Sequence, residues 1–429
     1  MITELQLENW KSYERSSLHI DALTVLIGTN ASGKSNALDA FILLNRIASG
    51  AMLTSALQGD GALTPMRGGI DWAAQRPKDK FAIGAVCRFD ETTDYEYRIE
   101  CRVSENRCDI TAEQLLRKKY RINKLGQRTT VAGEVRLFRT DPCHDMAPNI
   151  VARLYNGKMG TPRVLGRTHA VLFQLVGQKL GQEIQVGINV VVSSLKEIFY
   201  LDPIPSHMRA YSPLADKLDS DAKNIAGVIA ALSKPKQKEI EDVLTEYASK
   251  LPERDIRRVY AETVGKFKSD AMLYCEEDWL GVGDPHTIDA RGMSDGTLRF
   301  LAILTALLTR PETSLLVIEE IDNGLHPSRA NMLLDMLKTV GKQRGVDVLA
   351  TTHNPALLDA MGTEMVPFIT VAHRDKVTGH SVLVLLESMR QLPKLLAQGT
   401  IGRLSSRGLI EKSLQQSFDF EEFSELKHD

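Results

Sequence analysis

The sequence is poor in several features that would define a class of protein at once. Its five cysteines (Cys87, Cys101, Cys108, Cys143 and Cys275) are an odd number, and no two of them form a C-x-x-C pair. This pattern argues against a disulfide framework and a zinc ribbon, and it favours reduced thiols. There is no run of about 18 apolar residues, and the opening MITELQLENW lacks the basic flank and apolar stretch of a signal peptide. We therefore expect a cytoplasmic protein that makes no contact with a membrane.

A strong excess of one charge is also absent. The 53 Lys and Arg residues nearly balance the 55 Asp and Glu residues, so only a local patch can point to a nucleic-acid partner. The chain has 429 residues, of which 43% are hydrophobic. That length and composition suffice for two lobes, or for one large domain that carries an insertion.

Strand and helix signals alternate at the two ends of the chain. The apolar run 22–27 is typical of a buried strand, and apolar spacing predicts a helix over 35–48. Near the other end the pattern predicts a helix over 295–309, strands at 315–318 and 346–351, and a helix from Ser328. Such alternation is typical of a parallel sheet, so we expect the two end blocks to share one core.

The middle of the chain reads differently. Residues 50–80 show no clear periodicity. The pattern predicts a hairpin formed by 80–89 and 95–103, and it predicts helices over 222–232 and 234–251. No heptad pattern is sustained over three or four repeats, so we expect no long coiled coil.

A glycine-bounded loop is the strongest chemical signal. Residues 28–35 read GTNASGKS, which fits the pattern G-x-x-x-x-G-K-[ST] between a predicted strand and a predicted helix. The glycines let backbone N–H groups and the helix N-terminus face phosphate, Lys34 can reach the β- and γ-phosphates, and Ser35 can offer a hydroxyl to Mg²⁺. The residues expected to bind the nucleotide in this segment are Gly28, Asn30, Ser32, Gly33, Lys34, Ser35 and Asn36.

Two carboxylates follow a second apolar strand. Glu319 and Glu320 come directly after 315–318, at the carboxyl end where sheets of this kind bind ligands. Glu319 is then placed for the magnesium ion, and Glu320 can polarise a water that attacks the γ-phosphate.

Two weaker signals complete the set. Ser294 and Gly296 stand at the start of the helix predicted over 295–309, where they indicate either ordinary capping or an anion site. His353 follows the strand at 346–351, where an imidazole can hydrogen-bond a γ-phosphate.

In this order the motifs resemble the ABC-type ATPases, in particular the RecF, SMC/Rad50 and OLD-like group and related AAA-type ATPases. The resemblance rests on the loop 28–35, on 293–297 where the family has an LSGGQ-type signature, on Glu319-Glu320, on GLHP at 324–327 and on His353. It implies an α/β ABC-ATPase head with a P-loop core sheet, an antiparallel β subdomain and a short, mainly helical insertion. The expected parts are 1–104, 105–275 and 276–429.

The resemblance also implies a mechanism. In such ATPases two heads meet head to tail around ATP and Mg²⁺, so Ser294 and Gly296 would act on the nucleotide of the other head, while Lys34, Glu320 and His353 act in their own. We therefore expect a homodimer or a higher homo-oligomer. Asp295 departs from the usual glycine, Glu319 departs from the usual aspartate, and no Q-loop glutamine can be assigned.

Two functions fit this resemblance. The first is a sensor ATPase of a bacterial anti-phage system, similar to Septu PtuA and PARIS AriA, that controls a separate effector such as a nuclease. No D-x-D follows His353, so we expect this chain not to cut DNA itself. The alternative is a RecF-like, DNA-binding ATPase of recombination and repair.

Three further segments suggest partners. Nine Lys or Arg residues against three acids lie between Arg107 and Arg139, which predicts either a DNA or RNA surface or a solvated face. Arg209 and Tyr211 can line a partner surface or form a structural turn. The closing FDFEEFSELKHD, with Phe418, Phe420 and Phe423 among acids, predicts a docking segment, a final strand or a frayed tail.

Overall fold

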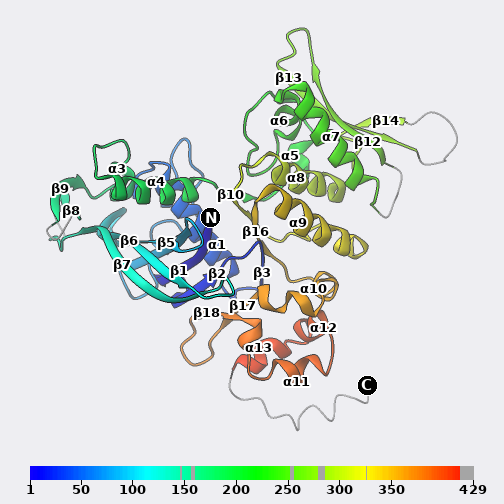
Figure 1. Cartoon of the computed structure of the whole chain (residues 1–429). Helices are drawn as coiled ribbons and strands as arrows, with labels where there is room; N and C mark the ends of the chain where they lie inside the picture. The colour runs from blue at the N-terminus through cyan, green and yellow to red at the C-terminus, as the bar shows by residue number, and fades with distance from the viewer. Residues whose placement is uncertain (145–146, 156–159, 252–255, 279–285, 325, 416–429) are drawn as a thin grey trace. The chain divides into compact units, whose positions relative to one another are not determined.

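The computed structural model describes residues 1–144, 147–155, 160–251, 256–278, 286–324 and 326–415 (Figure 1). The chain forms two compact units. Unit 1 contains Met1–Asp21, Gly28–Ile198 and Thr370–Val384, and unit 2 contains Ala22–Ile27, Phe199–Ile369 and Leu385–Asp429. The predicted boundary at 104/105 falls in a hairpin turn, and that at 275/276 falls inside a strand.

Unit 1 is built on a largely antiparallel sheet. Its strand order is β17-β18-β2-β1-β4-β5-β6-β7-β8-β9. The strands are β1 (Ile2–Trp10), β2 (Tyr13–His19), β4 (Lys80–Arg88), β5 (Thr93–Ser104), β6 (Arg107–Ile122), β7 (Arg128–Thr140), β8 (Asn149–Leu154), β9 (Thr161–Gly166), β17 (Ile369–Arg374) and β18 (Ser381–Leu385). The hairpin predicted over 80–103 is confirmed as β4 and β5, whose alternating residues pair from Lys80 with Arg102 to Arg88 with Asp94.

Helices cover one part of this sheet. They are α1 (Lys34–Ala48), α2 (Leu53–Gln58), α3 (Val171–Gln174) and α4 (Gln182–Lys196). Helix α4 packs on α1 and crosses β4 to β7 (Figure 1). The helix predicted over 35–48 is confirmed as α1. Helix α2 lies in the region predicted to be irregular, and it forms because Leu53, Ala56 and Leu57 bury one face.

The region 105–275, expected to be an insertion of helical and mixed character, begins with two long strands. Strand β6 continues the sheet from β5 through a turn in which Asn106 has a positive φ of 59°. Strand β7 is exposed along most of its length, so it lacks the alternation of apolar and polar residues by which a strand is recognised in a sequence. The basic segment between Arg107 and Arg139 is therefore a β-hairpin.

Unit 2 contains a parallel core. Its strand order is β10-β15-β16-β3, formed by β10 (Ile198–Leu201), β15 (Leu315–Ile318), β16 (Asp347–Thr351) and β3 (Leu23–Ile27). Helices α8 (Asp295–Thr309) and α9 (Ala330–Arg344) contact each other beside it. Strands β3, β15 and β16 are buried at every residue, as their continuous apolar runs predicted.

A smaller sheet and a group of helices complete unit 2. The sheet has the order β11-β13-β12, with β14 beside β13, and α6 and α7 pack on it. These elements are α5 (Pro205–Met208), β11 (Ser212–Pro213), α6 (Ile225–Ala231), α7 (Lys234–Ala248), β12 (Ile256–Val264), β13 (Asp270–Glu277) and β14 (His286–Asp289). The helices α10 (Pro355–Met361), α11 (Leu392–Leu396), α12 (Ile401–Ser406) and α13 (Leu409–Leu414) follow the core strands. Among the helices of the described residues, none combines the length and the hydropathy that a membrane-spanning helix needs.

A buried carboxylate joins the sheet of unit 1 to α3. Glu113 is 2% exposed, and its oxygens accept hydrogen bonds from the backbone N–H groups of Val171 and Leu172, each at 2.7 Å. The Tyr97 hydroxyl donates a third bond at 3.0 Å. Burial outweighs these bonds and raises the pKa of the Glu113 carboxyl to about 7.

This raised pKa predicts a pH-dependent stability. The proton on Glu113 stabilises the folded state fully below pH 4.5, and this stabilisation is lost as the pH rises through about 7. We expect Glu113→Gln to be less stable than the wild type at low pH, because its amide offers one acceptor oxygen, but to lack the decline across that window. Urea unfolding over this pH range measures the difference. The exposed Glu91→Gln should keep the wild-type profile, and a Glu113→Gln profile parallel to wild type would contradict the assignment.

Candidate functional site

The loop 28–35 in unit 1 has a backbone that requires glycine at both ends. Gly28 has a φ of 144° and Gly33 a φ of 111°. A Cβ on Gly28 would lie 2.1 Å from the Ala372 carbonyl oxygen, and one on Gly33 would lie 2.5 Å from Ser381 Oγ. The loop therefore fits tightly against β17 and β18, and a side chain at either glycine would force it to move.

The polar groups of this loop suit an anion. Helix α1 begins at Lys34 with no acidic residue in its first turn, so its N-terminus is positive. Ser32 is 2% exposed, and no hydrogen-bond partner for its Oγ exists among the described residues. Lys34 Nζ donates to the carbonyl oxygens of Gly28 (2.6 Å) and Thr29 (3.0 Å), so its ammonium bends back over the loop. A buried hydroxyl, an ammonium and a helix N-terminus fit the phosphates of a nucleotide.

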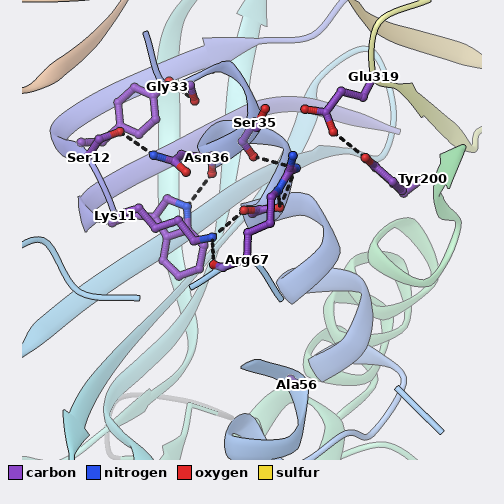
Figure 2. A network of polar contacts seen from close by, with 12 residues as sticks. Lys11, Ser12, Gly33, Ser35, Asn36, Ala56, Arg67, Tyr200 and Glu319 are labelled. Atoms are coloured by element: carbon purple, nitrogen blue, oxygen red, sulfur yellow. Dashed lines mark hydrogen bonds and ion pairs between the residues drawn. The ribbon is translucent and has the colours of Figure 1, made fainter. Parts of the chain in front are cut away.

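Asn36, predicted as a nucleotide ligand, makes contacts inside unit 1. The side-chain Nδ2 of Asn36 donates a hydrogen bond to Ser12 Oγ at 2.8 Å (Figure 2). The backbone carbonyl oxygen of Asn36 accepts a hydrogen bond from Trp10 Nε1 at 2.7 Å. The first turn of α1 is thus tied to the turn between β1 and β2. Asn30, by contrast, is exposed on the loop.

An ionic network that the sequence did not reveal lies behind the loop. Asp39 on α1 is 1% exposed, and its carboxylate accepts from Lys11 Nζ at 2.5 Å and from Arg67 Nη2 at 2.9 Å (Figure 2). Arg67 also donates to the carbonyl oxygen of Ser35 at 3.4 Å. Burial lowers the pKa of Lys11, and the neighbouring Asp39 charge opposes this. The network connects the turn after β1, the 50–80 region and the backbone of Ser35, one of the two residues predicted to hold magnesium.

The predicted acidic pair occurs in unit 2 where β15 ends. Glu319 Oε2 accepts from the Tyr200 hydroxyl at 2.6 Å, a contact from β10 that the sequence did not predict (Figure 2). Glu320 is exposed and has a positive φ of 49°, and its N–H donates to Thr351 Oγ1 at 2.8 Å. The adjacent strand β16 thus fixes the backbone that presents Glu320.

The structure brings His353 to the same edge of the core. Strands β15 and β16 are parallel, with Ile318 opposite Ala350, so the segments after them emerge together. The Thr352 hydroxyl donates to Asp322 Oδ1 at 2.5 Å and joins these segments, while His353 itself is exposed. Strand β3 lies beside β16 in the same direction, and the chain continues from β3 directly into the loop 28–35.

The signature-like segment 293–297 begins α8. Ser294 caps this helix, because its Oγ accepts from Thr297 N at 3.1 Å, and its side chain is exposed. Gly296 is buried, and a Cβ there would lie 2.8 Å from the Gly324 carbonyl oxygen, so the glycine permits close packing within unit 2. Arg209 Nη2 donates to the Met293 carbonyl oxygen (2.9 Å) and to Asp295 Oδ1 (2.7 Å).

These contacts explain two features of the sequence. Asp295, which departs from the glycine usual in the resembling family, holds Arg209. Arg209, an undecided surface residue in the sequence, anchors the start of α8. Of the GLHP motif, Leu325 lies outside the described residues. No cluster of three or more His, Cys, Asp or Glu side chains that could hold a metal occurs in the described part of the chain.

Two family models match the chain. A model described as "AAA ATPase domain" matches residues 1–124, which include the loop 28–35. A model described as "AAA domain, putative AbiEii toxin, Type IV TA system" matches residues 208–359, which include Ser294, Glu319, Glu320 and His353. The matches support an ATPase of the ABC-like and AAA type.

Curated relatives match over a shorter stretch. The chain is similar to the methionine import ATP-binding protein MetN of Bradyrhizobium diazoefficiens (29% identical over 87 residues, 20% of this chain and 25% of that protein). It is similar to MetN 1 of Salmonella typhimurium (30% over 76 residues, 18% of this chain and 22% of that protein). The aligned part of the chain thus spans about a quarter of the length of these relatives.

Solved structures of Smc heads are similar over most of the chain. An Smc head of Pyrococcus furiosus bound to the C-terminal domain of ScpA has a TM-score of 0.49 and 13% identity, and the match covers 92% of this chain and 98% of that one. The SMC head of Thermotoga maritima has a TM-score of 0.42 and 14% identity, with 90% and 98% covered.

The network around Asp39 predicts a large loss of stability on mutation. Asp39→Ala leaves the buried Lys11 ammonium without its main partner, so we expect the free energy of unfolding to fall by about 3–5 kcal/mol. Lys11→Met with Asp39→Leu removes both charges and should recover much of this loss, since Arg67 is half exposed and can turn to water. Denaturant unfolding measures both variants, with the exposed Asp71→Ala as control. A double variant as unstable as the single one would exclude the ionic explanation.

Proposed function

We propose that this protein binds ATP with Mg²⁺ at the loop 28–35 and hydrolyses it. The observation that carries the proposal is the loop itself, in which Gly28 and Gly33 adopt positive φ and α1 presents its N-terminus. Ser35 and Glu319 are the residues that would hold Mg²⁺, which supplies charge neutralisation on the phosphate oxygens when bound. Lys34 binds the phosphates and stabilises their negative charge.

Glu320 is the proposed general base, and His353 the proposed hydrogen-bond donor to the γ-phosphate. The side chain of Glu320 is exposed on a backbone fixed by Thr351, so it can accept a proton from an attacking water without moving the strand. Glu319 accepts a hydrogen bond from Tyr200, whereas Glu320 is held through its backbone by Thr351. These different partners support different roles for the two carboxylates.

Ser294 is proposed to act on the nucleotide of a second copy, which makes the working unit a homodimer or a higher homo-oligomer. Its exposed hydroxyl stands at the N-terminus of a 15-residue helix. Arg209 and Asp295 fix the segment that presents this hydroxyl. A positive helix end with an exposed serine favours contact with phosphate.

At the level of biology, we propose a regulatory ATPase of a bacterial anti-phage system that controls a separate effector. The description of the model that matches 208–359 names a toxin of a type IV toxin–antitoxin system, which supports a role in bacterial conflict. The alternative, a RecF-like DNA-binding ATPase, needs an uncompensated basic surface. Arg117 pairs with Glu183, Lys118 with Glu96 and Arg128 with Asp94, so part of the basic segment between Arg107 and Arg139 is already compensated by acids.

Two substitutions separate binding from turnover. Lys34→Ala should weaken ATP binding by about 100-fold, because it removes a charge-assisted contact to phosphate. Ser294→Arg should leave ATP binding unchanged and lower kcat by about 100-fold, because it blocks the second head. Calorimetric ATP titration and a phosphate-release assay measure the two effects.

Controls address folding and association. Ser294→Asn keeps a capping oxygen for α8 and should show a similar loss of turnover without loss of stability. Glu320→Gln should bind ATP, fail to hydrolyse it and accumulate as a dimer. Normal turnover in Ser294→Arg would show that the head-to-tail arrangement is wrong.

The effector is sought by affinity purification. Isolated from its native host with Mg-ATP present, the chain should retain a nuclease-like or toxin-like protein in about equimolar amount, and Lys34→Ala should alter that association. Mass spectrometry identifies and quantifies what is bound. Recovery of recombination proteins and DNA in its place would favour the repair ATPase.

A further inference from the structure

Strand β7 in unit 1 has an edge that is only partly paired. Strand β8 pairs with β7 at Phe138, Arg139 and Thr140, and the N–H of Tyr155 donates to the Leu137 carbonyl oxygen at 3.0 Å. Before Leu137, residues 129–136 are all exposed and pair on one side with β6. No described residue forms a strand on their other side. Such an edge offers backbone N–H and C=O groups to an added strand.

A groove lies at one end of this edge, beside residues 134–136. It has a volume of about 680 Å³ and is lined by Glu134, Val135 and Arg136 of β7, by Tyr155, and by residues 181–184 at the start of α4. If β8 were extended past Tyr155, it would continue beside β7, and the groove lies at that position. Val131 and Val135 are 50% and 37% exposed, so the edge also offers apolar side chains.

The two acids that line the groove, Glu134 and Glu183, pair with Lys118 and Arg117, so the charge that is left around this edge is positive. Lys119 is exposed opposite Gly133, Arg121 is exposed beyond it, and Arg136 stacks on the Tyr155 ring at 5.7 Å. None of these three cations has an ion pair with another described residue. The nearby Arg117, Lys118 and Arg128 are already paired with acids. Of these three cations, Arg136 lies on β7 itself, and Lys119 and Arg121 lie on the neighbouring strand β6. The positive charge that is left therefore lies on the open stretch of β7 and next to it.

This charge selects the occupant. If the β7 edges of two copies of the chain paired with each other, Lys119, Arg121 and Arg136 of one copy would lie near the same cations of the other. The repulsion between like charges makes this pairing unfavourable. An added strand must be acidic and must carry apolar side chains for the groove. Residues 418–423 of this chain, outside the described part, read FDFEEF and contain three phenylalanines, three acids and no base.

We propose that residues 417–426 of a second copy of this chain bind as an added strand along the open edge of β7, between Thr129 and Arg136. Backbone hydrogen bonds supply most of the affinity, Phe side chains enter the groove, and the acids face Lys119 and Arg136. The interaction requires no nucleotide, so it stands or fails separately from ATP binding.

Self-association of the full chain tests this interface. In analytical ultracentrifugation at low salt and without nucleotide, we expect reversible dimers or larger assemblies that an excess of the synthetic peptide SFDFEEFSEL dissociates. Lys119→Glu with Arg136→Glu should weaken association at least about tenfold, as should Glu421→Lys with Glu422→Lys. Arg163→Glu, an exposed charge reversal on β9, is the matched control and should have no effect.

A charge swap gives the decisive comparison. The chain that carries all four reversals has an acidic edge and a basic tail, so it should associate better than either pair of reversals alone. A full chain that stays monomeric, or a swapped chain no better than its halves, would overturn the proposal. A peptide that binds β7 of a chain that remains monomeric would overturn the assignment to a second copy.

Discussion

The parallel pairing of three buried strands determines where the segments that carry most of the proposed catalytic residues begin. In unit 2, Val25 of β3 lies opposite Ala350 of β16, and Ala350 lies opposite Ile318 of β15. Because the strands run in one direction, the polar segments that follow them start at one edge of the sheet. A shift of the register by one residue would separate the Glu320 N–H from Thr351 Oγ1 and would misalign side chains that are buried on both faces of the sheet. Burial of the core therefore fixes the positions of the acids.

Residues without a proposed role in the chemistry hold those for which such a role is proposed. Thr351 fixes the backbone of Glu320, Tyr200 orients Glu319, and Arg209 anchors the segment that presents Ser294. In unit 1, Ser12 and Trp10 tie down the first turn of α1 through Asn36. Each contact joins segments far apart in the sequence. Side chains placed in this way need little rearrangement when charge develops next to them.

The sequence was sufficient to predict those helices, strands and loops whose residue pattern is local. Helices α1 and α8 and strands β3, β15 and β16 were predicted because buried faces repeat with the period of a helix or form short apolar runs. The loop 28–35 was predicted because its glycines have few other uses at that spacing. The tight fit of Gly28 against Ala372 was not predicted, because Ala372 belongs to a strand more than 300 residues away in the sequence.

The features that could not be predicted from the sequence depend on contacts between distant segments or on strands that are exposed to solvent. Lys11, Asp39 and Arg67 form one network from three separate segments, and nothing in their local pattern distinguishes them from surface charges. Strands β6 and β7 were expected to be part of a mainly helical region, because an exposed hairpin does not need alternating residues. The nine basic residues between Arg107 and Arg139 suggested a nucleic-acid surface when they were counted along the chain. In three dimensions several of them neutralise acids on neighbouring elements. The cations left without an ion pair to a described residue lie on β6, on β7 and in the turn between them: Lys119, Arg121, Lys124, Arg136 and Arg139. A partner that adds a strand uses both that charge and the open backbone, whereas a nucleic acid would use the charge alone.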